Sequence, residues 1–349
     1  MQQVKRSAFT ILPISNKRQR QSPRLNKIHT SQLNSHAFYT EEAYRNELSR
    51  PSTTRPSTTS ISPINIMRSK SNKTICFFAT EHSSDQTHTQ FQLFKTHLSD
   101  SKPPDIIISE LILNSEAFLN QYTEYSKTEP KDNVAEQFLK TSFRECGYAA
   151  ALVLQKNPKC KLLCPEPSKE AIGSYLCKYY SPEKVFCYEM AELIMTYYHL
   201  KTDDSLRQWI DKSFKNYKKS MVERNPSFWR GFNFSCANFT RLFKGKIIAE
   251  LDTIPTKDRR LYTDYPPQNK QDPFDERNKD FFSQLHNPSL SDSFINRMAF
   301  NVSLQRDNNL CQMVNDQLAA GHQRILIVYG KGHFGVNERS LQTILNHYL

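Results

Sequence analysis

Three side chains that can bind a metal ion or transfer a proton follow three short apolar runs of this sequence. They are His82, Glu110 and His333. Two neutral imidazoles and a carboxylate form a usual ligand set for a divalent metal ion such as Mn, Zn or Co. A metal held in this way lowers the pKa of a bound water molecule and polarises a carbonyl group. The same histidines can also act as general bases without a metal, and the sequence leaves both mechanisms open.

Four further residues are candidates for roles beside these three. Glu81 precedes the first histidine, and Glu145 lies on the apolar face of a predicted helix, so both are candidates for acid–base catalysis. Arg306 could stabilise a developing oxyanion, and Asp307 could orient a histidine. The alternative for Glu145 is an ion pair with an arginine. For Arg306 and Asp307 the alternative is a solvated helix face.

The elements that carry these residues alternate between strands and helices. Apolar runs predict strands at 74–80, 105–109, 160–164 and 325–330, and helical spacing predicts helices at 85–98, 133–156, 183–200, 292–320 and 338–348. This alternation predicts an α/β fold with a mostly parallel central sheet flanked by helices. Ligands of such sheets bind outside the carboxyl ends of the strands. Residues 201–290 lose the alternation, and we expect an irregular, mostly helical insertion or cap there.

Glycine is rare in this chain, and four of its eight glycines fall between Gly321 and Gly335. We expect Gly321 to end the helix that precedes the last strand. The glycines that bracket His333 predict a tight turn with a positive φ, which would expose the histidine ring.

The first 72 residues differ in composition from the rest. Residues 1–73 hold 13 Lys and Arg against 3 Glu, so they carry +10 of the net charge of +12. They are rich in polar residues and repeat the sequence Arg-Pro-Ser-Thr-Thr at 50–59. We expect a disordered basic tail, dispensable for folding, with one short helix at 40–48, followed by an α/β domain at 73–349. The basic cluster 17–20 could bind an anionic partner or an import receptor, and a solvated linker is the alternative.

Composition also excludes several classes of protein. The nearly neutral remainder of the chain argues against a nucleic-acid-binding domain. The eight cysteines form no CxxC pair, and no apolar run approaches the roughly 20 residues of a membrane span. The N-terminus has no apolar signal-peptide core, so we expect an intracellular protein. Nuclear targeting and signal-independent export both stay open.

The motif Gly330-Lys-Gly-His333, preceded by Arg306-Asp307 on a helix, resembles the Tiki/TraB/GumN-like proteins. Their relatives include the erythromycin-esterase and haem-binding ChaN-like proteins. That family carries two Gly-x-x-His motifs, with a glutamate and an arginine between them. The first motif departs here, with Ala79 in place of glycine before Glu81-His82. The resemblance covers about residues 73–170 and 290–349.

The resemblance implies a compact α/β domain and, for the Tiki branch, metal-dependent hydrolysis of peptides. We therefore expect a metal-assisted hydrolase of a peptide or of a small ester or amide. Its metal ligands would be His82, Glu110 and His333. A second hypothesis is an inactive binding or effector-type protein that keeps the fold and uses its basic tail for targeting. The departure at Ala79 and the basic tail favour this second hypothesis.

Overall fold

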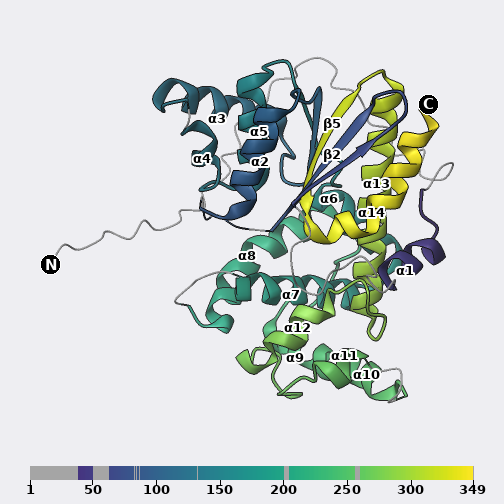
Figure 1. Cartoon of the computed structure of the whole chain (residues 1–349). Helices are drawn as coiled ribbons and strands as arrows, with labels where there is room; N and C mark the ends of the chain where they lie inside the picture. The colour runs from purple at the N-terminus through teal and green to yellow at the C-terminus, as the bar shows by residue number, and fades with distance from the viewer. Residues whose placement is uncertain are drawn as a thin grey trace. The chain divides into compact units, whose positions relative to one another are not determined.

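Five strands in the described part of the chain form one mixed sheet (Figure 1). The structure, a computed structural model, describes residues 38–49, 63–81, 83, 85, 87–131, 133–199, 204–255 and 260–348. The strands are β1 (Ile64–Arg68), β2 (Thr74–Thr80), β3 (Ile106–Ser109), β4 (Lys161–Leu163) and β5 (Arg324–Gly330). They lie in the order β1-β2-β5-β3-β4, and all neighbours except β1 and β2 are parallel. The predicted α/β fold with a mostly parallel sheet is confirmed.

The two central strands are apolar on both faces, as is typical of a parallel sheet covered by helices on each side. All four residues of β3 are buried, and so are all residues of β5 after Arg324. The parallel register pairs Thr80 with Gly330 and Ser109 with Val328. The carboxyl ends of β2, β5 and β3 therefore meet at one edge of the sheet.

One face of the sheet is covered by helices from the first half of the chain, drawn together beside β2 in Figure 1. They are α2 (Thr89–Asp100), α3 (Ser115–Thr128), α4 (Val134–Phe138) and α5 (Arg144–Lys156). Their apolar side chains pack with Phe78, Ile107 and Val328 of the sheet. Phe78 stacks on Phe94 of α2 with ring centroids 4.3 Å apart.

The predicted helix 133–156 is wrong in its middle, because the structure has two helices there, α4 and α5, with a non-helical segment between them. The Thr141 hydroxyl donates to the Phe138 carbonyl and accepts from the Phe143 amide, so a side chain takes over hydrogen bonds that a helix would use. The two helices then pack closely at Gly147. A Cβ atom there would lie 3.0 Å from the Phe138 Cβ of α4 and 2.7 Å from the Phe143 Cβ, so a larger residue would force the helices to shift.

The other face is covered by α13 (Phe294–Ala319), α14 (Lys331–His347) and the short helix α1 (Glu41–Ser49) (Figure 1). As expected, α13 ends at Gly321, whose φ is +95°. The amides of Gly321 and His322 donate to the carbonyls of Leu318 and Gln317, which completes a Schellman motif.

Residues 201–290 are mostly helical, as expected, and they belong to a larger helical layer with its own apolar core. The core begins earlier than predicted, at Leu176, and extends into the first turns of α13 as far as Val302. Its members are α6 (Lys169–Tyr179), α7 (Pro182–His199), α8 (Leu206–Arg224), α9 (Cys236–Leu242), the π-helix η1 (Phe243–Ile248), α10 (Ala249–Thr253), α11 (Arg260–Asp264), the 3-10 helix η3 (Glu276–Asn278) and α12 (Lys279–Leu285). Among the described residues, no helix is both long and apolar enough to span a bilayer.

The expected domain boundary at residue 72 lies too far along the chain. The short helix predicted at 40–48 is present as α1, and the Thr40 hydroxyl accepts from the Ala43 amide at its start. Tyr44 of α1 is 1% exposed, and β1 adds an antiparallel edge to the sheet. Composition placed the domain boundary wrongly, because a few large apolar side chains are enough to pack an otherwise polar segment against the domain. The predicted disorder of residues 1–37 and 50–62 lies outside the described residues.

Candidate active site

His333 lies at the carboxyl edge of the sheet, in the first turn of α14. The expected tight turn is wrong, because the helix begins directly at Lys331 and Gly330 has a φ of −53°. In the described part of the chain, Gly231 and Gly321 alone among glycines have a positive φ. The His333 side chain keeps 18% exposure, so the helix start presents the ring at the edge without a loop.

The His333 ring is held by a buried carboxylate. Its Nδ1 lies 2.8 Å from Asp307 Oδ1, and the Asp307 side chain is 2% exposed. Burial lowers the pKa of His333, but the hydrogen bond and charge of Asp307 outweigh burial, and the pKa lies above its ordinary value. Burial likewise raises the pKa of Asp307, but its hydrogen-bond donors outweigh that effect and lower it. A carboxylate on Nδ1 fixes the tautomer and leaves Nε2 for chemistry.

Two residues that the sequence did not single out complete the environment of Asp307. The Tyr44 hydroxyl donates to Asp307 Oδ2 at 2.5 Å, and the Asn337 amide donates to Oδ1 at 2.7 Å. Asn337 accepts in turn from the Tyr39 hydroxyl at 3.3 Å. Asn337 was missed because the predicted helix began only at residue 338, whereas α14 begins at Lys331 and places Asn337 one helical turn after His333. The contact with Tyr44 was not predictable, since 263 positions separate the two partners.

Arg306 bridges two carboxylates beside this pair. Its Nη2 lies 2.8 Å from Glu110 Oε1, and its Nε lies 2.5 Å from Glu166 Oε2. Glu110 Oε2 also accepts from the Gly330 amide at 3.0 Å, which ties the end of β3 to the end of β5. Burial lowers the pKa of Arg306, but the two carboxylates outweigh burial and raise it. Glu166 follows β4 as Glu110 follows β3. We looked in the sequence for charged residues after three of the strands, and the same search after β4 would have found Glu166.

The predicted glutamates Glu81 and Glu145 lie at the same edge. Glu81 Oε1 is 3.1 Å from Lys331 Nζ, and its side chain is 56% exposed. Glu145 is fully buried in the first turn of α5. The next residue, Cys146, lies with its Sγ 3.7 Å from the Val328 carbonyl, which places the start of α5 against β5.

A tyrosine and a cysteine line the same region. Burial and the nearby carboxylates raise the pKa of Tyr329 well above its ordinary value. Its hydroxyl is buried, has no hydrogen-bond partner among the described residues, and belongs to a ring 5.4 Å from that of His333. Burial raises the pKa of the Cys164 thiol to about 12, so Cys164 is unsuited to act as a nucleophilic thiolate.

The structure brings Glu110, Arg306, Asp307 and His333 together, whereas His82 lies outside the described residues. Within the residues that are described, no group of three or more His, Cys, Asp and Glu side chains could hold a metal ion. The metal site with His82 as a ligand therefore stays a prediction. Comparisons with family models, with curated proteins and with solved structures found no match to this chain.

The pKa of His333 can be measured to test this arrangement. In the Asp307→Asn variant, the charge that raises the pKa is gone and burial remains, so we expect the pKa to fall below the ordinary histidine value of about 6.5. The measurement is an NMR titration of the His333 ring protons. An unchanged pKa in this variant would contradict the role given to Asp307.

The same pair also affects stability. The pKa of His333 is higher in the folded than in the unfolded chain. We therefore expect the ion pair to contribute its full share to the free energy of unfolding below about pH 6.5, and this share to be lost as pH rises through the folded pKa.

Proposed function

We propose that the protein is a hydrolase of amide or ester bonds and that His333 is its general base. The observation that carries the proposal is the buried Asp307–His333 pair at the carboxyl edge of a parallel sheet. A histidine held by a carboxylate is the usual device for activating a weak nucleophile. The resemblance to the Tiki/TraB/GumN-like proteins is part of this proposal, and it rests on the order of Arg306-Asp307, β5 and His333.

In this mechanism, His333 Nε2 takes a proton from a water molecule as the water oxygen attacks the carbonyl carbon of the substrate. The tetrahedral intermediate then collapses, and His333 returns the proton to the departing amine or alkoxide. Asp307 keeps the ring oriented and stabilises its protonated form. The Tyr329 hydroxyl lies near His333 but is buried, so we assign it no contact with the substrate. Arg306 contributes positive charge nearby while it positions Glu110 and Glu166.

A second version of the proposed mechanism includes a divalent metal ion, with His82 as one of its ligands. With His82, Glu110 and His333 as ligands, the metal ion would lower the pKa of the attacking water. This version requires Glu110 to turn from its present partners, the Arg306 guanidinium and the Gly330 amide. The version without a metal needs no such rearrangement.

Single-turnover hydrolysis of a library of peptides and esters tests the proposal. The arms are the protein with a chelator and the protein supplied with Mn²⁺, Zn²⁺ or Co²⁺. We expect hydrolysis in at least one arm. Hydrolysis that survives the chelator and the variant His82→Ala supports the general-base version, and loss in both supports the metal version. His347→Ala, at the exposed end of α14, is the control.

A second candidate function is binding without catalysis. It is favoured by one observation, namely that Arg306 is already paired with two carboxylates and so is not free to meet a substrate anion. In this version the basic residues before position 38 would deliver the domain to an anionic partner. The absence of hydrolysis in every arm of the same assay would sink the hydrolase proposal and favour this candidate.

A further inference from the structure

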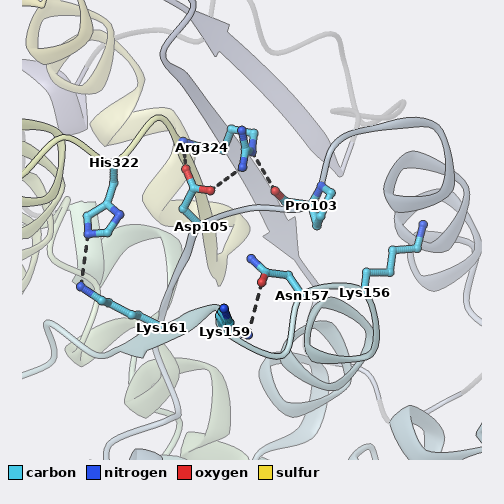
Figure 2. A pocket seen from close by; sticks show the side chains of 8 residues that line it. All are labelled: Pro103, Asp105, Lys156, Asn157, Lys159, Lys161, His322 and Arg324. Carbon is cyan, nitrogen blue, oxygen red and sulfur yellow. Dashed lines mark hydrogen bonds and ion pairs between the residues drawn. The ribbon is translucent and has the colours of Figure 1, made fainter.

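A pocket of about 480 Å³ opens at the amino ends of the strands, the opposite edge of the sheet from His333 (Figure 2). Its walls come from the segment before β3, from the loop between α5 and β4, and from the loop between α13 and β5. Three lysines, one arginine and one histidine line it, against a single carboxylate. The proposed hydrolase does not use this pocket.

The single carboxylate, Asp105, is fully engaged. Its Oδ2 accepts from the amides of Gln323 and Arg324 at 3.1 and 3.0 Å, and its Oδ1 accepts from the Arg324 guanidinium. Arg324 also donates to the Pro103 carbonyl at 2.8 Å. Figure 2 shows these two side chains facing each other. Asp105 and Arg324 therefore neutralise each other and form a fixed wall.

One of the three lysines has a structural explanation. Lys156 Nζ donates to the Leu98 carbonyl in the last turn of α2, at 2.5 Å, where a cation complements the helix dipole. Lys156 therefore adds positive charge to the pocket without needing a ligand.

Lys159 and Lys161 have no such explanation. Both are exposed, and in the part of the chain that the structure describes neither forms an ion pair with a carboxylate. Lys161 Nζ lies 3.4 Å from His322 Nε2 (Figure 2). The Lys161 ammonium can donate to the neutral His322 ring, so this hydrogen bond holds the two side chains side by side at the pocket. The pocket therefore carries a surplus of positive charge, which favours an anionic ligand.

We propose that this pocket binds a small polyphosphate anion. Lysine ammonium groups are compact, strongly hydrated charges that suit phosphate oxygens, whereas bidentate binding of a carboxylate calls for an arginine, and Arg324 is occupied. Two or three lysines match the charge of a diphosphate. The site is concave and local, and the net charge of residues 74–349 is close to neutral, which disfavours an extended nucleic acid.

Isothermal titration of the full chain with inorganic pyrophosphate tests this proposal. We expect saturable binding that weakens as salt is raised. The double variant Lys159→Ala/Lys161→Ala should bind roughly tenfold more weakly or worse, since it loses both free charges. The matched control is Lys127→Ala/Lys140→Ala, which removes the same charge from exposed positions of the chain elsewhere.

Two outcomes would overturn the proposal. One is that the wild type shows no saturable binding of pyrophosphate, whether or not it binds anionic vesicles or RNA. The other is an equal loss of binding in the two double variants. Circular dichroism shows whether each variant is folded. The assay does not depend on hydrolysis, so its result is separate from that of the proposed function.

Discussion

Replacement of His333 by alanine is expected to lower the rate of single-turnover hydrolysis by about 10²–10⁴-fold, which is the usual contribution of a general acid–base catalyst. We expect the fold to survive, because Asp307 keeps its hydrogen bonds from Tyr44 and Asn337 when the ring is removed. The measurement is hydrolysis of the best substrate from the library, with circular dichroism as the test of folding.

Two control variants define the specificity of this result. His347→Ala removes a histidine from the other end of the same helix, and Cys164→Ala removes a thiol that lies 3.6 Å from the Glu110 carbonyl. Both should keep the wild-type rate. A His333→Ala protein with full activity, or a Cys164→Ala protein without activity, would show that the general base is wrongly assigned.

Removal of residues 1–70 is expected to destabilise the protein strongly. A chain that begins at Ser71 lacks the buried side chains Tyr39, Tyr44 and Met67 and the whole of β1. Burial of one large apolar side chain stabilises by about 1.5–3 kcal/mol, so three such losses amount to about 5–9 kcal/mol. Since 1 kcal/mol shifts the Tm of a domain of 150–250 residues by about 2–4 °C, we expect Tm to fall by about 10 °C or more.

The comparison is a chain that begins at Phe38, which retains α1 and β1. It should melt within a few degrees of the full chain. The single change Tyr44→Phe separates the hydrogen bond to Asp307 from the burial of the ring, because it keeps the ring and removes the hydroxyl. Equal Tm values for the chains that begin at Phe38 and at Ser71 would show that the N-terminal segment contributes no stability.

The sequence predicted the sheet well, because its parallel strands are continuous apolar runs bounded by polar residues and turns. The run 74–80 agrees with β2 at both ends, and the end of α13 at Gly321 was readable from glycine chemistry. The spacing of apolar residues predicted one continuous helix over 133–156, because such spacing does not detect the competing side-chain hydrogen bonds of Thr141. The start of α14 was missed because glycines near position 330 were taken to require a turn.

The candidate site was predictable where it depends on local position. Glu110 and His333 follow strands, and the carboxyl ends of parallel strands meet. What could not be predicted is which partner each charged group takes. Arg306 was expected to stabilise a developing oxyanion, and in the structure its partners are Glu110 and Glu166. Ion pairs between such distant positions leave no periodicity in the sequence, and the same is true of Tyr44 with Asp307.

The place of β5 in the sheet has a consequence for the order of folding. β5 lies between β2 and β3, yet more than two hundred residues separate it from both. During synthesis, β2 and β3 emerge early but have no common neighbour until β5 leaves the ribosome. Until then their unpaired edges are open to wrong partners, and a sheet of such high contact order forms slowly. The helices α6–α12 have their own apolar core and precede β5 in the chain. We therefore expect this helical layer to fold before the sheet is completed by β5.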